Sequence, residues 1–142
     1  MSDTSNLPPR SGAYDEPSAA EDRMLPIVVH TLHLLVFATG ISPIIGVIIA
    51  YMGRKEPESW RTSHYEFAIW TFWLAMAGAA IGWLLIGVGI PLLLALGLGI
   101  IPIVVGGLVL GLVGIWFGVR SVLGLVYAVR GEPYPRPRNL IL

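Results

Sequence analysis

The chain lacks cysteine altogether among its 142 residues, which excludes disulfides, thiolate nucleophiles and Cys-ligated zinc. Charge is also scarce, since 13% of the residues are Asp, Glu, Lys or Arg, and nine basic residues balance nine acidic ones. Nothing in this balance attracts nucleic acid. The sequence contains no GxSxG, Walker-type glycine loop or HExxH, and no carboxylates paired within an apolar stretch. We therefore expect no enzyme activity, no catalytic residues, no cofactor and no metal.

Apolar residues dominate what is present, at 55% of the chain. Residues 24–53 carry no formal charge, and 53 further uncharged residues separate Glu66 from Arg120. A helix needs about 20 apolar residues to cross the hydrocarbon of a bilayer, so the second stretch fits two crossings and a turn, whereas three crossings need about 60. We predict an all-α integral membrane protein with three transmembrane helices, at about 26–53, 65–88 and 102–129, in one domain over 24–130.

The flanking and linking segments are read from composition. Residues 1–23 are acidic, polar and poor in large apolar side chains, so we expect a disordered tail. Residues 131–142 form a tail rich in Pro and Arg. Pro43 is expected to kink the first helix. The apolar link at 90–101 fits a re-entrant segment or an extra helix, and the sequence leaves both open.

The distribution of basic residues predicts the orientation of the three crossings. Seven Lys and Arg residues fall in the first loop or at and after the end of the third helix, and only Arg10 and Arg23 fall on the opposite side. Because basic residues accumulate in cytoplasmic loops, we expect a multi-pass protein of the inner membrane with its N-terminus outside and its C-terminus in the cytoplasm.

Glycines recur at helical spacing in the second and third predicted helices. Closely packing transmembrane helices carry small residues on their facing sides, so we expect these two helices to form a tight, glycine-lined hairpin. The same spacing also fits a face for a homo-oligomer or for other membrane proteins. The glycines assigned to helix packing are Gly78, Gly82, Gly107, Gly111, Gly114 and Gly118.

Two histidines, His30 and His33, lie three residues apart on one side of the first predicted helix, near its outer end. A metal would need further ligands, and His64 is expected at the opposite membrane face. We interpret the two residues as a packing or proton-sensitive pair, and Thr39 and Ser42 as groups that hydrogen-bond between helices.

Arg120 lies 18 residues after Pro102, which is about 27 Å along a helix. We expect its side chain to snorkel to the cytoplasmic surface. The functional alternative is an ion or lipid-headgroup contact that Arg120 shares with Arg61, His64 and Glu66.

Three groups of residues carry a family resemblance. They are Gly46, Ile48, Ile49, Ala50 and Tyr51; Ser63, His64, Tyr65, Phe67, Thr71, Phe72 and Trp73; and Arg130, Gly131, Glu132, Pro133, Tyr134 and Pro135. Over about 25–138 the chain resembles the bacterial membrane proteins of the Tic-twenty-like domain-of-unknown-function family. The resemblance implies a helical inner-membrane protein, distantly similar to the channel-candidate subunit of the chloroplast protein-import translocon, which is described as four-helical.

These observations lead to a functional hypothesis. We expect a noncatalytic inner-membrane protein that serves as a packing or assembly partner in an envelope process, with the lipid bilayer, other copies or other membrane proteins as its partners. The alternative is a small channel or transporter subunit, because glycine-broken segments line transport paths. A third class, a lipid-binding regulator, follows from the basic cytoplasmic face.

Overall fold

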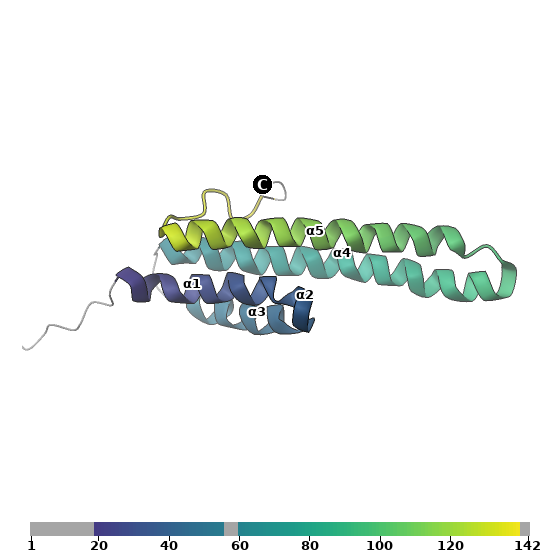
Figure 1. Ribbon diagram of the computed structural model, residues 1–142, viewed down its shortest axis with the longest axis horizontal. Helices are drawn as coiled ribbons and strands as arrows, with labels where there is room; N and C mark the ends of the chain where they lie inside the picture. Colours follow the sequence, from purple (N-terminus) through teal and green to yellow (C-terminus); the bar gives the residue numbers. More distant parts are fainter. Residues whose placement is uncertain (1–18, 56–59, 140–142) are drawn as a thin grey trace, which may run out of the picture.

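The computed structural model describes residues 19–55 and 60–139, and within these ranges every regular element is a helix. The prediction of an all-α protein is confirmed. The predicted disordered tail falls outside the described residues over 1–18, while its last five residues belong to the first helix. The helices are α1 (Ala19–Leu34), α2 (Val36–Thr39), α3 (Ser42–Gly53), α4 (Trp60–Leu96) and α5 (Ile100–Arg130) (Figure 1).

The long hairpin, formed by α4 and α5, runs along most of the length of the described molecule (Figure 1). At 37 and 31 residues, these helices measure about 55 Å and 46 Å. Both are long and apolar enough to cross a membrane. Only 11% of the residues in the apolar window of each helix are buried inside the molecule, whereas the core helix of a soluble protein is mostly buried.

The turn between the two long helices is shorter than the sequence indicated. Helix α4 continues through Pro91 to Leu96, and Gly97 turns the chain with φ at 70°. No separate segment therefore occupies 90–101. A break at Pro91 would leave unpaired backbone groups in an apolar environment. Gly87, four residues earlier, has open space around it and is the residue whose carbonyl the proline ring approaches.

The first apolar stretch folds differently from the expected single helix over 26–53, and that prediction is wrong. Helix α1 ends at Leu34, and the short α2 is closed by Gly40 with φ at 73°. Pro43 then lies in the first turn of α3, where its missing N–H costs no hydrogen bond. Helix α3 runs back along α1. The two helices pack closely, since a Cβ on Gly46 would lie 3.2 Å from the carbonyl oxygen of Val29. We call α1 to α3 the N-terminal hairpin.

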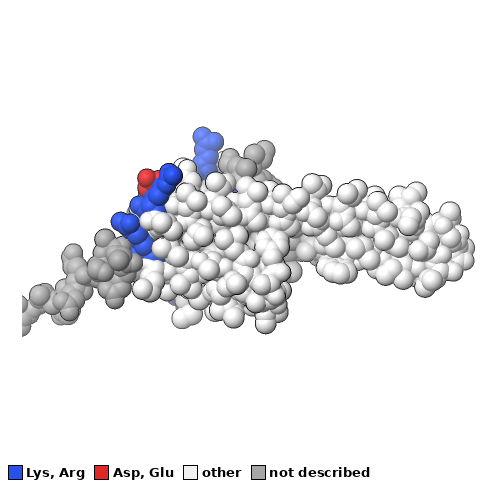
Figure 2. All heavy atoms as spheres, in the orientation of Figure 1, with Lys and Arg blue, Asp and Glu red and all other residues white. Residues whose placement is uncertain are grey.

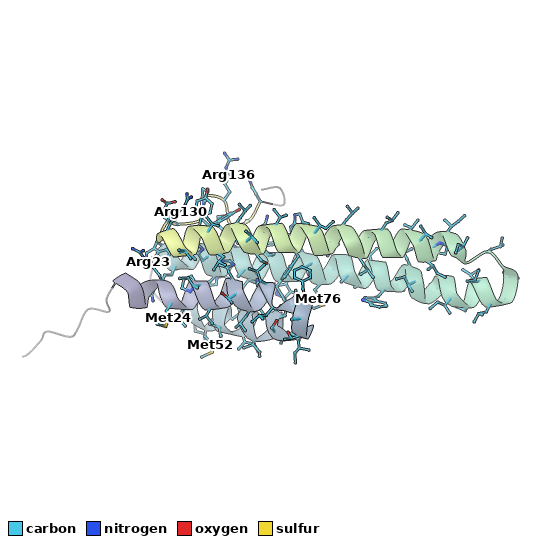
Figure 3. All side chains as sticks on the ribbon, viewed as in Figure 1. Arg23, Met24, Met52, Met76, Arg130 and Arg136 are labelled. Atoms are coloured by element: carbon cyan, nitrogen blue, oxygen red, sulfur yellow. The ribbon has the colours of Figure 1, made fainter. Side chains whose placement is uncertain are left out.

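This reversal brings the beginning of α1 to the same end of the molecule as the end of α5. The Arg23 guanidinium donates a hydrogen bond to the carbonyl oxygen of Val129 at 3.4 Å. Figure 3 shows Arg23 and Arg130 at this shared end. The expectation that Arg23 lies on the opposite side from the C-terminal basic residues is therefore wrong. The error follows directly from counting the first stretch as one full crossing.

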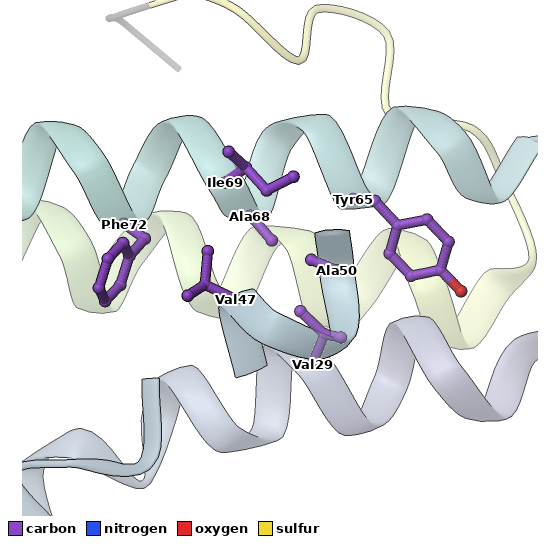
Figure 4. Packing of buried hydrophobic residues seen from close by; sticks show 7 residues of the cluster. All are labelled: Val29, Val47, Ala50, Tyr65, Ala68, Ile69 and Phe72. Carbon is purple, nitrogen blue, oxygen red and sulfur yellow. The ribbon is translucent and has the colours of Figure 1, made fainter. Parts of the chain in front are cut away.

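A hydrophobic cluster holds the N-terminal hairpin against the long hairpin (Figure 4). Burying such side chains contributes about 1.5 to 3 kcal/mol each where contact with water is removed, and in lipid the close contacts themselves stabilise the packing. The cluster reaches only the half of the long hairpin in which α4 begins and α5 ends, and we call it the basic half. The other half is a pair of helices with no further described helix packed on it (Figure 1). Its buried members are Val29 of α1, Val47 and Ala50 of α3, and Tyr65, Ala68, Ile69 and Phe72 of α4.

Candidate functional site

All three histidines of the chain meet inside the basic half of the molecule. His30 and His33 project from α1, and His64 projects from α4. Their exposed fractions are 0%, 1% and 0%. The ring of His30 lies 5.7 Å from that of His64 and 6.3 Å from that of His33. The expectation that His64 lies at the opposite membrane face is wrong, because α1 and α4 start at the same end.

Most of these histidine nitrogens have no hydrogen-bond partner. Both ring nitrogens of His30 are unpartnered, as are Nε2 of His33 and Nδ1 of His64. Buried polar atoms are normally hydrogen-bonded, so this group marks a candidate site. Within the described residues, no three His, Asp or Glu side chains are arranged to hold a metal ion. The arrangement therefore offers hydrogen-bonding nitrogens and no ligand set for a metal.

Arg120 is the second feature of the site, and its side chain points into the protein. Its exposed fraction is 1%, so the expectation that it snorkels to the surface is wrong. The Nε atom donates to the Thr71 hydroxyl at 3.0 Å, and Nη1 donates to the carbonyl oxygen of Asn139 at 2.6 Å. The guanidinium carbon lies 4.2 Å from the ring centroid of Phe67, within the range of a cation–π interaction.

The predicted group of Arg61, His64, Glu66 and Arg120 is divided between different surroundings. His64 and Arg120 are buried, whereas the Glu66 carboxylate pairs with other arginines. Arg54 approaches it to 3.4 Å, and Arg138 approaches it to 3.1 Å. Arg61 lies in the first turn of α4, beside this ion-pair group in sequence.

Residues 131–139 cover this site, and we call them the C-terminal strap. They follow α5 at Gly131, whose φ is 72°, and return toward the middle of the long hairpin (Figure 1). The carbonyl oxygen of Glu132 accepts a hydrogen bond from His64 Nε2 at 2.8 Å. The Tyr134 N–H donates to the Ser63 hydroxyl at 2.9 Å.

Tyr134 anchors the strap with its side chain. Its ring stacks on Phe67 at 3.8 Å between centroids and is 7% exposed. Burial raises the pKa of the Tyr134 phenol, and the nearby Arg120 guanidinium opposes that shift. Sequence reasoning placed residues 131–142 in a tail and missed this contact. The available signal was a lone aromatic residue between prolines, which fits an anchored strap as well as a free tail.

The glycines divide into two groups with different surroundings. A Cβ on Gly78 or Gly82 would meet Val113 or Leu110 of α5 at 2.6 Å, as expected for a packed hairpin. Gly107, Gly111 and Gly114 have no atom within 4 Å of a Cβ position. These three residues form what we call the open glycine face. The expectation that they face α4 is wrong.

The contact between α4 and α5 uses glycines that the sequence pattern did not single out. Gly118, also expected in that contact, lies instead beside the Phe37 ring, at 3.4 Å from a Cβ position. Gly89 of α4 approaches Ile103 of α5, while Gly99 and Gly106 approach α4. The hairpin is thus lined by a set of glycines that overlaps only partly with the predicted one.

A pocket of about 280 Å³ lies beneath the tip of the N-terminal hairpin. Its lining is apolar, so it offers space and no chemistry. It is bounded by Gly40 and Phe37 at the tip, by Phe72 and Ala79 of α4 and by Phe117 of α5, among others.

Comparisons with protein-family models, with curated proteins and with solved structures give no match. The two features that bear on function are the buried polar group beneath the strap and the open glycine face.

Proposed function

We propose that this chain is a noncatalytic inner-membrane protein that acts as an assembly partner and binds another membrane helix on its open glycine face. The carrying observation is that Gly107, Gly111 and Gly114 have no neighbour within 4 Å of a Cβ position. In lipid, helices associate by close packing, which small residues permit. Gly78, Gly82, Gly89, Gly99 and Gly106 already approach the neighbouring long helix, whereas these three leave room for a partner.

The proposed membrane arrangement has two crossings. Helices α4 and α5 cross the bilayer, and the N-terminal hairpin enters from one side and returns. The described basic residues lie in the basic half of the molecule. Those visible in Figure 2 gather toward the end where α4 begins and α5 ends. They are Arg23, Arg54, Lys55, Arg61, Arg120, Arg130, Arg136 and Arg138. The positive-inside rule supports a cytoplasmic position for this end.

Two crossings imply that both termini lie in the cytoplasm, instead of an N-terminus outside. A reporter enzyme active only outside the cytoplasm is therefore expected to be inactive at either terminus. The same reporter fused after Leu98, in the turn between α4 and α5, should be active and serves as the control. Activity at the N-terminal fusion would contradict the two-crossing arrangement.

The open glycine face is tested by cross-linking in native membranes, which the absence of native cysteine makes clean. Gly111→Cys is expected to form cross-links, because a partner helix would lie in contact with it. Leu84→Cys is the control, since Leu84 is 66% exposed on α4. A product of twice the chain mass would identify a homo-oligomer, and another mass a different membrane protein. Equal cross-linking at both positions would contradict the proposal.

A channel or transporter subunit is the second candidate function. The re-entrant shape of the N-terminal hairpin favours it, because re-entrant segments in membranes line water-filled paths or lie buried in protein. The distant resemblance to a translocon subunit also motivates this candidate. Two crossing helices enclose no path by themselves, so several copies would be required. Solute or ion flux into liposomes that contain the purified protein separates this candidate from a passive assembly partner.

A further inference from the structure

Arg120 is a buried cation that has no anionic partner among the described residues. Nε donates a hydrogen bond to the Thr71 hydroxyl, and Nη1 donates one to the Asn139 carbonyl oxygen. Nη2 has no hydrogen-bond partner. The carboxylate of Glu66, which lies on the same helix as Thr71, is paired with Arg54 and Arg138. A buried guanidinium is costly unless it is paired and hydrogen-bonded. Arg120 therefore has a positive charge and a hydrogen-bond donor, Nη2, available for an anion.

The Asn139 carbonyl occupies the position on Arg120 that an anion would take. Arginine binds phosphate and carboxylate through two parallel N–H donors. Here Nη1 donates a hydrogen bond to a neutral backbone oxygen, and Nη2 has no hydrogen-bond partner. The strap thus supplies a weak internal substitute for a ligand.

The strap is held near this point by contacts that permit release. The ion pair between Arg138 and Glu66 is solvent-exposed on the Arg138 side, where the side chain is 62% exposed. Exposed ion pairs are weak and are screened by salt. The stronger anchor, Tyr134 on Phe67, lies five residues earlier in the strap. The last residues of the strap are therefore able to detach while Tyr134 stays in place.

We propose that Arg120 is the centre of a binding site for a phosphate-type anion, which displaces the end of the C-terminal strap. The anion accepts hydrogen bonds from Nη1 and Nη2, while Thr71 keeps Nε in position. The depth favours a lipid headgroup as its source, given the membrane placement proposed above. Arg120 lies 20 residues after Ile100, or about 30 Å along α5, which equals the thickness of the hydrocarbon layer.

The site is tested with a nitroxide label on the strap. Asn139→Cys keeps the backbone carbonyl, and no other cysteine competes for the label. In phosphatidylcholine vesicles the label is expected to be immobilised. Phosphatidylglycerol in the vesicles should mobilise it progressively. Inorganic phosphate added to the protein in detergent provides the second arm: mobilisation there identifies free phosphate as sufficient, and mobilisation by phosphatidylglycerol alone identifies a lipid headgroup.

Two variants show whether Arg120 itself is responsible. Arg120→Lys keeps the charge and removes the paired donors, so about tenfold more phosphatidylglycerol should be needed to mobilise the label. Arg130→Lys, at the exposed end of α5, should respond like the parent. Equal responses of the two variants would overturn the proposal. Should Arg120→Lys fail to fold, the labelled parent still decides, because a label that stays immobilised in both phosphatidylglycerol and phosphate would overturn it too. Neither result depends on whether the open glycine face binds a partner.

Discussion

Gly106→Leu is expected to destabilise the protein by about 3 kcal/mol, whereas Gly107→Leu, at the next residue, should leave the stability unchanged or raise it by up to about 1 kcal/mol. A Cβ on Gly106 would lie 2.6 Å from the carbonyl oxygen of Gly82 and 2.8 Å from the Ile86 side chain. The backbone of α4 cannot yield without separating the two helices. Gly107 faces open space, so its added side chain meets only the surroundings of the protein.

The comparison is sharp because the two substitutions are chemically identical. Both replace glycine with leucine in the interior of α5, and both therefore gain the same helix propensity, about 1 kcal/mol. Any difference between them reports the contact with α4. Thermal unfolding of each variant in the same detergent measures it. Equal stabilities would mean that Gly106 does not pack against α4.

The sequence predicts close packing between the two long helices, but it does not predict which face of α5 meets α4. Glycines at spacings of three and four predict close helix packing, and Gly78 and Gly82 do pack against α5. In α5, however, Gly106 and Gly107 are neighbours, and each begins a different face of the helix. Which face meets α4 depends on the rotation of the whole helix. That rotation is set by every contact between the long helices and by the N-terminal hairpin, so no local pattern reveals it.

The first apolar stretch differs from the predicted single helix for a related reason. Its 30 uncharged residues satisfy the length of one crossing, and length alone does not separate a crossing from two shorter helices folded together. Thr39, Gly40, Ser42 and Pro43 lie at the middle of the stretch and are residues that favour turns. The decisive factor is tertiary, because the reversal packs Val29 of α1 and Val47 of α3 into one hydrophobic cluster with α4.

The candidate site was only partly visible in the sequence. Arg120 stands out as a charged residue among apolar ones, whereas His64 lies in a polar segment. Both prove to be buried. Their partners are backbone carbonyls of Asn139 and Glu132. A backbone oxygen carries no residue-specific signal, so composition could not identify the strap as part of the site.

Gly124→Ala is expected to destabilise the protein by about 3 kcal/mol, because the added methyl group would overlap the ring of His30. His30 is fully buried, so its ring has little room to move. Gly118→Ala is the matched control on the same helix. Its methyl group would approach the Phe37 ring at 3.4 Å, an ordinary contact, and the substitution should be neutral or slightly stabilising.

A double variant then tests the reversal of the N-terminal hairpin. His30→Ala removes the ring that Gly124→Ala would strike, so the combined variant should be about 2 kcal/mol more stable than the sum of the two single effects predicts. Thermal unfolding of the four proteins of this cycle measures the coupling. In a three-crossing arrangement, His30 would lie near the outer face and Gly124 near the cytoplasmic face, so the two effects would simply add. The coupling therefore distinguishes a hairpin that returns to its own side from a helix that crosses the bilayer.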